Sequence, residues 1–337
     1  EVLNENQMQL MINPPCGGVF FLREAIAKHL KEFRGMTVLP EQIIVGAGTE
    51  YLYGLLIQLL GNEKIYAVEN PGYQKIGKIY QSYKVLCKYI DMDEEGVEIS
   101  KLEENQVDIA HISPSHHYPT GIVMPVSRRY ELLGWAAKSE NRYIIEDDYD
   151  SELRLSGQPI PTLQSMDVSD KVIYMNTFTK TLASTVRISY MILPRELVQQ
   201  YYKKLSFYSC TVSNFEQYTL AKFIEEGYFE KHINRLRNYY HNKRNTIVET
   251  IKKSRLNQYV SISGEEAGVH FLMKIETKRP QEQLMENAKA QGIKLSPLSA
   301  YYKENREEIQ NTYVMNYSSI ELEKIEKVVT RLVKCCE

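Results

Sequence analysis

The sequence is short of the features that mark several specialised classes of protein. Only five of its 337 residues are Cys, and none of them forms a C-x-x-C pair. This excludes a disulfide framework and argues against a zinc site, so we expect reduced thiols and no bound metal. No apolar run approaches the ~20 residues of a membrane helix, and the N-terminus has no signal-peptide core. Neither charge dominates, because 41 Lys and Arg stand against 43 Asp and Glu, which argues against a nucleic-acid-binding surface. These absences predict a cytoplasmic globular protein.

Short apolar runs alternate with helical patterns over the first 194 residues. Strand-like runs lie at 43–48, 64–69, 107–113, 142–148, 171–176 and 187–194. Strands that alternate with helices of this length are typical of βαβ units around a mostly parallel sheet. Beyond residue 194, long helical segments reach residue 254, and short strand-like runs then alternate with helices. We therefore predict a large α/β domain followed by a smaller α+β domain.

Two segments at predicted strand ends carry reactive side chains. Lys180 follows the strand at 171–176 in a turn rich in Thr, and a cluster of carboxylates with Tyr149 lies at the end of the strand at 142–148. Ligands of open α/β sheets bind at the carboxyl ends of the strands. Taken singly, a Lys is most often a solvated surface group, and an acidic cluster can also bind Mg²⁺. No phosphate-binding G-x-x-x-x-G-K-[ST] loop accompanies this cluster.

Three further turns add weaker signals. GAGTEYLYGLL (46–56) leads from a strand into a helix, whose first N–H groups are suited to a phosphate. Tyr73 ends a Pro-Gly-Tyr turn after the strand at 64–69, and the polar turn SPSHHYPTG occupies 113–121. Each has an ordinary structural explanation alone, but pyridoxal 5′-phosphate accounts for all five segments together. It needs a Lys for a Schiff base, a carboxylate at the pyridine nitrogen, and hydroxyls, an Arg and a helix N-terminus for its phosphate.

These segments resemble the fold-type-I aspartate aminotransferase superfamily. They are most similar to the aminotransferase-like effector domain of MocR/GabR-type transcriptional regulators of the GntR family. The resemblance covers nearly the whole chain and rests on SPSHHYPTG (113–121), IIEDDYDSE (144–152), NTFTKTLASTVRISYMILP (176–194), FIEEGYFEKHINRLRNYY (223–240) and EAGVHFL (266–272).

The fold that the resemblance implies is α/β with three parts. An N-terminal segment and first helix occupy 1–35, and a large cofactor-binding domain at 36–230 has a mostly parallel seven-stranded sheet between helices. A long connecting helix and a small α+β domain follow at 231–337.

The resemblance also implies roles for individual residues. Lys180 would carry pyridoxal phosphate as a Schiff base, Asp147 would pair with the pyridinium nitrogen, and Tyr149 would hydrogen-bond the ring oxygen O3′. Tyr73 would stack on the ring. The phosphate would be held by Gly48, Thr49, Thr177, Thr179 and Arg187.

The sequence departs from the family pattern at several points. Ala47 removes a hydroxyl from the phosphate turn, and Tyr118 stands where the enzymes carry the Asn of N-P-T-G. Fold-type-I aminotransferases hold the substrate carboxylate with an Arg in the C-terminal strand, but Val314 or Met315 aligns there. A carboxylate ligand would therefore need another cation or backbone donors. The residues considered for contact with such an effector are Arg23, Lys75, His116, His117 and Tyr118.

Three functions are compatible with these residues. The regulator resemblance favours a sensor with little or no turnover, in which an amino compound binds as an external aldimine in place of Lys180. Such a sensor would control DNA through a separate N-terminal winged helix-turn-helix domain that this chain does not contain. Because the chain begins with Glu1 rather than Met, we expect it to derive from something longer. The alternatives are an active aminotransferase, with Lys180 as the proton shuttle, and a sensor of pyridoxal phosphate itself. The resemblance further implies a homodimer and no membrane partner.

Overall fold

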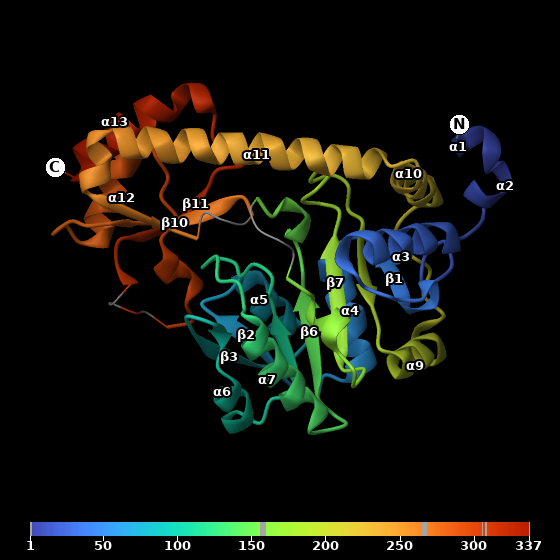
Figure 1. Ribbon diagram of the computed structural model, residues 1–337. Coiled ribbons are helices and arrows are strands. Elements are labelled where there is room, and N and C mark those ends of the chain that lie inside the picture. The colour runs from blue at the N-terminus through green and yellow to red at the C-terminus, as the bar shows by residue number, and fades with distance from the viewer. Residues whose placement is uncertain (1, 156–159, 265–267, 305, 307–308, 337) are drawn as a thin grey trace.

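The computed structural model describes residues 2–155, 160–264, 268–304, 306 and 309–336 (Figure 1). Residues 266 and 267, which begin the EAGVHFL motif, lie outside these ranges. Within them the chain forms the predicted α/β part followed by a smaller part with its own antiparallel sheet. No helix in the described ranges is both long and apolar enough to cross a membrane.

The large sheet has eight strands within the described residues, in the order β1-β8-β7-β6-β5-β2-β3-β4. Strands β7, β6, β5, β2 and β3 are parallel, whereas β8 lies antiparallel between β7 and β1, and β4 pairs antiparallel at the far edge. The seven expected strands are present, and the two-residue β4 is an eighth. The strands are β1 (Ile43–Gly46), β2 (Ile65–Asn70), β3 (Leu86–Asp93), β4 (Gly96–Val97), β5 (Ile109–Ile112), β6 (Tyr143–Asp147), β7 (Val172–Thr177) and β8 (Ser189–Ile192).

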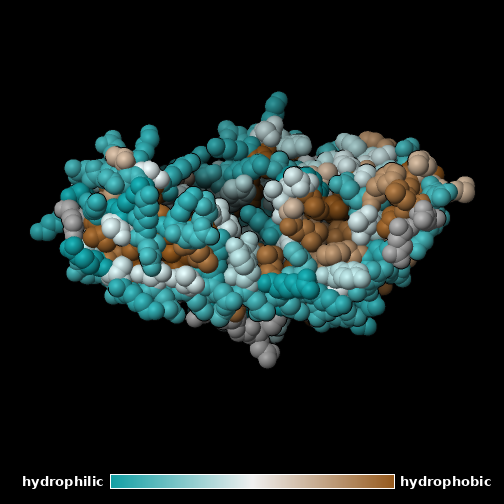
Figure 2. All heavy atoms as spheres, turned by 90° about the horizontal axis from the view of Figure 1, so that it is seen from above, coloured by the Kyte–Doolittle hydropathy of each residue, from teal (hydrophilic) through white to brown (hydrophobic). Residues whose placement is uncertain are grey.

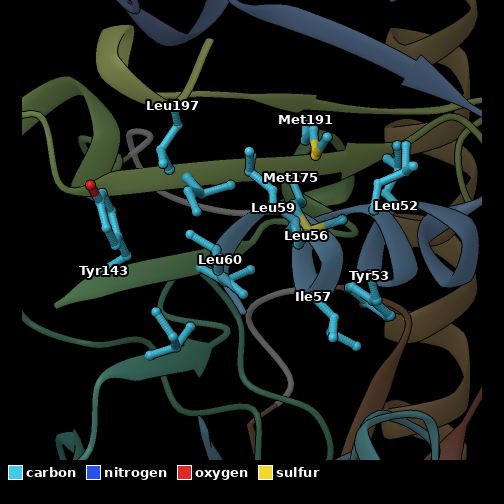
Figure 3. Packing of buried hydrophobic residues seen from close by; sticks show 14 of the residues in the cluster. Leu52, Tyr53, Leu56, Ile57, Leu59, Leu60, Tyr143, Met175, Met191 and Leu197 are labelled. Carbon is cyan, nitrogen blue, oxygen red and sulfur yellow. The ribbon is translucent and has the colours of Figure 1, made fainter. Parts of the chain in front are cut away.

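Helices cover both faces of this sheet. Strands β5, β6 and β7 are buried at every position, as expected for a sheet enclosed on both sides. Helices α4, α5 and α9 pack on one face, where Leu56 and Leu59 of α4 lie beside Met175 and Met191 (Figure 3). Helices α3 and α10 cover the other face near β1, and α6, α7 and α8 cover it near β5. The helices of this part are α1 (Val2–Glu5), α2 (Gln7–Leu10), α3 (Phe20–Arg34), α4 (Thr49–Leu60), α5 (Gln74–Ser82), α6 (Ile99–Glu104), α7 (Val126–Ala137), α8 (Leu163–Met166), α9 (Arg195–Leu205) and α10 (Asn214–Glu225).

A long helix, α11 (Tyr228–Lys253), lies along both parts of the molecule (Figure 1). Phe229 and Ile233 near its start join the core under α3, whereas Ile247 and Ile251 join the core of the smaller part. The division expected between residues 230 and 231 therefore falls within the first turn of this helix. The smaller part contains β9 (Val260–Ser263), β10 (His270–Ile275) and β11 (Thr312–Asn316), with α12 (Gln281–Ala290) and α13 (Ile325–Cys336).

The surface differs between the two ends of the molecule. Figure 2 shows apolar side chains gathered on the half that carries the N-terminal helices, whereas hydrophilic side chains cover most of the opposite end. The exposed apolar residues near the N-terminus include Met8, Met11 and Ile12, which are more than half exposed at 82%, 78% and 63%. An apolar surface of this kind is typical of a protein interface.

Candidate functional site

Five turns meet at the carboxyl ends of the strands that run in the same direction (Figure 1). They follow β1, β2, β5, β6 and β7, which are the strands after which the sequence predicts ligand contacts. Because neighbouring parallel strands end at the same edge of the sheet, side chains distant in the sequence are brought together here.

Asp147, the last residue of β6, is 7% exposed and keeps one carboxylate oxygen without a partner. Its Oδ2 accepts a hydrogen bond of 2.6 Å from the Tyr53 hydroxyl and lies 3.4 Å from His111 Nε2. The Tyr80 hydroxyl lies 2.6 Å from the other ring nitrogen of His111. Asp147 Oδ1 is buried and has no hydrogen-bond partner among the described residues. Because leaving such an oxygen unpaired is costly, Oδ1 is suited to accept an N–H from a ligand.

The adjacent carboxylate, Asp148, has its partners within the protein. Arg34 Nη2 of α3 lies 2.6 Å from Asp148 Oδ2, and the Tyr174 hydroxyl of β7 donates to the same oxygen at 2.7 Å. Asp148 is buried and Arg34 nearly so, with side chains 1% and 10% exposed. The pair joins α3 to the sheet, so the structure gives Asp148 a structural role.

The start of α4 and the turn after β7 bring together five residues whose groups are suited to an anion, and we call them the phosphate seat: Gly48, Thr49, Thr177, Thr179 and Arg187. Gly48 precedes α4 with φ of 90°, and a Cβ at this position would collide with the Arg187 guanidinium. Glycine thus allows Arg187 to lie against the helix N-terminus, where the first N–H groups have no partner within the helix. Thr177 Oγ1 donates to Thr179 Oγ1 at 3.0 Å, and Thr179 Oγ1 donates to the carbonyl before Arg187 at 3.0 Å. The hydroxyls and the guanidinium are therefore held by one turn.

Lys180 lies in the same turn and is exposed, so its amine is accessible. It also lies near the smaller domain, since its charge acts on His270 of β10. Burial is the main cause that lowers the pKa of His270 to about 3, and the Lys180 charge contributes to the decrease. Lys180 is thus placed between the sheet edge and the smaller domain.

His116 and Tyr149 form the contact between the sheet edge and β10. His116 Nδ1 lies 2.9 Å from Asp150 Oδ2 and 3.4 Å from the Tyr149 hydroxyl. The His270 ring lies 4.7 Å from that of His116, and a Cβ on Gly268 would collide with His116. Burial raises the pKa of Tyr149 well above its usual value, and nearby carboxylates raise it further. The Tyr149 hydroxyl therefore remains protonated and able to donate a hydrogen bond.

Tyr118 makes a second contact between the domains. Its hydroxyl lies 2.7 Å from the hydroxyl of Tyr301, which ends a 3₁₀ helix at residues 298–301, and its ring meets His270 edge-on at 5.0 Å. Tyr73 meets the Tyr118 ring edge-on at 6.1 Å, and the Gly72 N–H donates to the Tyr301 carbonyl at 3.0 Å. The aromatic residue expected to stack on a ligand ring is thus linked to the smaller domain through Tyr118.

Three residues considered for effector contact are engaged elsewhere. Arg23 is buried and donates to the carbonyl of Pro40 at 3.3 Å and to a Tyr hydroxyl of α9 at 3.2 Å. Lys75 pairs with Glu50 at the phosphate seat. His117 is buried behind the turn, where its Nδ1 bonds the Thr120 hydroxyl at 2.7 Å. The structure brings only His116 and Tyr118 of the five to the domain contact beside Lys180.

The C-terminal strand provides no replacement for the Arg that the enzymes carry. Strand β11 reads TYVMN, and Val314 is 5% exposed and pairs with Leu272 of β10. The expected departure from the family pattern is therefore located in a partly buried edge strand of the smaller sheet.

Sequence reasoning missed the residues that surround Asp147. Tyr53, Tyr80 and His111 form its hydrogen-bond network, and Glu69 at the end of β2 is buried nearby, where burial raises its pKa to about 8. A signal was available, because Glu69 and His111 are polar residues inside otherwise apolar strand runs. Tyr53 and Tyr80 carried no such signal, since aromatic residues on a helix are usually part of the core.

The residues at this site fit pyridoxal phosphate. The unpaired Asp147 Oδ1 suits a pyridinium N–H, the Tyr149 hydroxyl suits the ring oxygen, and the phosphate seat presents N–H groups, hydroxyls and Arg187. Lys180 is the amine accessible at the same edge. No group of His, Cys, Asp and Glu able to hold a metal ion occurs among the residues that the structure describes.

Comparison with known proteins identifies relatives of two kinds. The family model for aminotransferase class I and II matches residues 3–332. The uncharacterized HTH-type transcriptional regulator YdeL of Bacillus subtilis is 41% identical over 85% of this chain and 61% of its own length. The probable rhizopine catabolism regulatory protein MocR of Rhizobium meliloti is 32% identical over 83% of this chain and 57% of its own length. The pyridoxine biosynthesis regulator PdxR of Corynebacterium glutamicum is 30% identical, over 86% and 62% respectively. The chain thus spans about three fifths of these regulators.

Solved structures of aminotransferases superpose on this chain. The kynurenine aminotransferase of Pyrococcus horikoshii, solved in complex with PMP, superposes with a TM-score of 0.84 at 25% identity, over 99% of this chain and 84% of that one. The multiple substrate aminotransferase of Thermococcus profundus gives a TM-score of 0.83 at 26% identity, over 99% and 85%. An aminotransferase is also among the sequence relatives: aromatic-amino-acid aminotransferase 1 of Thermococcus litoralis is 26% identical over 99% of this chain and 82% of its own length.

Proposed function

The chain belongs to the class I and II aminotransferase family, and from this premise we propose that it is the pyridoxal-phosphate-binding sensor domain of a transcriptional regulator. The observation that carries the proposal is a group of residues that fits pyridoxal phosphate, together with a C-terminal strand without an Arg. Relatives named as HTH-type regulators at up to 41% identity support it. In such a protein, DNA would be bound by a helix-turn-helix domain outside this chain.

Pyridoxal phosphate, when bound, supplies an aldehyde that condenses reversibly with primary amines. The chain's own residues would orient it: Asp147 at the ring nitrogen, Tyr149 at the ring oxygen, Tyr73 against the ring face, and the phosphate seat at the other end. Lys180 would hold the aldehyde until an amino compound replaces it. We propose that this replacement alters the Tyr118–Tyr301 and His116–His270 contacts, because both lie where the two domains meet beside Lys180.

Two other functions are each favoured by one observation. An active aminotransferase is favoured by the superposition on the P. horikoshii enzyme. In that case Lys180 would move a proton on the substrate, as a general base placed next to it. A sensor of the cofactor itself is favoured by the similarity to PdxR, whose name refers to pyridoxine biosynthesis. Such a sensor needs no carboxylate-binding Arg.

The test is a titration of the apoprotein with pyridoxal phosphate, followed by a panel of L- and D-amino acids. Borohydride reduction and peptide mass spectrometry should locate the cofactor on Lys180, and Lys180→Ala should lose this covalent linkage while keeping the wild-type melting temperature. A visible band that one amino acid shifts without release of a keto acid supports the effector sensor. Conversion to the pyridoxamine form with keto acid release supports the enzyme, and a band that no amine changes supports the cofactor sensor. Labelling of a residue other than Lys180 refutes the assignment.

A further inference from the structure

A carboxylate of the chain itself lies at the phosphate seat. Glu50 is the second residue of α4, and its Oε1 lies 3.6 Å from Arg187 Nη2 and also pairs with the Lys75 ammonium. The three side chains are 45%, 49% and 47% exposed, so none of them is locked in a buried network. The hydrogen bond from Lys75 lowers the pKa of Glu50, and the charges of Lys75 and Arg187 lower it further. Glu50 is therefore negatively charged at neutral pH.

This carboxylate occupies the electrostatic position that a phosphate requires. The N-terminus of α4 and the guanidinium that lies against Gly48 together attract an anion. Glu50 already lies beside this guanidinium, and a carboxylate in the first turn of a helix is stabilised by the helix dipole. In addition, Ala47 leaves the turn one hydroxyl short. A phosphate that enters the seat must therefore share Arg187 with Glu50 or displace it.

We propose that Glu50 is an internal competitor for the phosphate seat, which weakens the affinity of this domain for phosphorylated ligands. The inference rests on the proposed function, because the ligand concerned is pyridoxal phosphate. It adds a regulatory property to that function: repulsion between Glu50 and the phosphate dianion raises the dissociation constant, so that saturation of the domain requires a higher concentration of the cofactor. Lys75, which already pairs with Glu50, limits the repulsion because it can keep this pair when the phosphate displaces Glu50 from Arg187.

The decisive variant is Glu50→Gln, which removes the charge and keeps the size of the side chain. At low ionic strength we expect its dissociation constant for pyridoxal phosphate to be about tenfold lower than that of the wild type, and the difference to shrink as salt screens the repulsion. Pyridoxal, which lacks the phosphate, should bind both proteins equally. Inorganic phosphate, measured by its protection against thermal unfolding, should also bind the variant more tightly.

Glu103→Gln is a matched control. Glu103 lies on α6, is 44% exposed and pairs with Lys138 at 3.0 Å. The variant therefore makes the same change of charge in an ion pair outside the site. It should leave the affinity for pyridoxal phosphate and for inorganic phosphate unchanged.

The outcomes separate this inference from the proposed function. Unchanged phosphate binding by Glu50→Gln overturns the inference, because Glu50 would then have no effect on the anion. Weaker binding also overturns it, because Glu50 would then hold Arg187 in place for the anion. An equal gain for pyridoxal also overturns it. A wild-type protein that forms no linkage to Lys180 refutes the proposed function, whereas the arm with inorganic phosphate still tests Glu50.

Discussion

Glu69 provides a quantitative prediction about pH and stability. It is the residue before the last in β2 and is 7% exposed. Its Oε2 accepts the Ser113 N–H at 2.9 Å and lies 3.5 Å from His117 Nε2. Burial raises the pKa of Glu69 from 4.5 to about 8, with the Asp147 charge adding to the increase. The folded protein therefore holds a proton on Glu69 over a pH range in which the unfolded chain has lost it.

The sign and size of the effect follow from this difference. Between the two pKa values the native state binds more protons than the unfolded state, so the stability contributed by Glu69 falls as pH rises. At ~1.4 kcal/mol per pH unit, Glu69 should lower the free energy of unfolding by about 2 kcal/mol between about pH 6.5 and about pH 8.5. Burial lowers the pKa of His117 to about 3, so it is neutral in the folded protein throughout this range. In the unfolded chain it loses its proton near pH 6.5, which adds a smaller change of opposite sign at the lower end of the range, common to the wild type and to a Glu69 variant.

Glu69→Gln should remove this component. The amide oxygen can still accept the Ser113 N–H, and no charge remains to be buried. Urea unfolding of the wild-type and variant apoproteins at several pH values gives the slope of the free energy of unfolding against pH for each protein. The contributions of Glu146 and Glu152 cancel in the difference between the two slopes. Burial raises the pKa of these two carboxyls to about 7 in both proteins. If the variant kept the wild-type slope from neutral to alkaline pH, the buried, protonated state of Glu69 would be refuted.

The remaining predictions concern the site and its support. Asp147→Asn should weaken pyridoxal phosphate binding by about 10- to 100-fold, because a charge-assisted hydrogen bond is lost; equal affinities in the titration would contradict the pairing role. Arg34→Met should lower the free energy of unfolding by about 3–5 kcal/mol, since it leaves Asp148 buried without its cation; a loss below ~1 kcal/mol in urea would show that the pair is dispensable. Gly268→Ala should displace His116, since φ is 63° and a Cβ collides with its ring; an unchanged melting temperature would contradict the close packing.

The sequence alone was sufficient for the fold class and for locating candidate site residues at the ends of strands. The alternation of strand and helix patterns predicted the parallel sheet, because hydrophobic periodicity is a local property. The strand that was not identified, β3, is only partly buried, and Lys88 and Asp91 interrupt its apolar pattern. The residues after the strands were also identified from the sequence, since strand ends of an open α/β sheet are where ligands bind.

The tertiary structure alone decided what each of these residues contacts. Asp147 and Asp148 are adjacent and chemically identical. Only the packing of Arg34 from α3 and of Tyr174 from β7 distinguishes the paired carboxylate of Asp148 from that of Asp147, which has an unpaired oxygen. Lys75, two residues after Tyr73, was considered for a carboxylate ligand, but the fold turns it toward Glu50. Such partners lie tens to hundreds of residues apart along the chain. Local sequence patterns carry no information about these distances, because the partners meet only when separate strands and helices pack around one sheet edge.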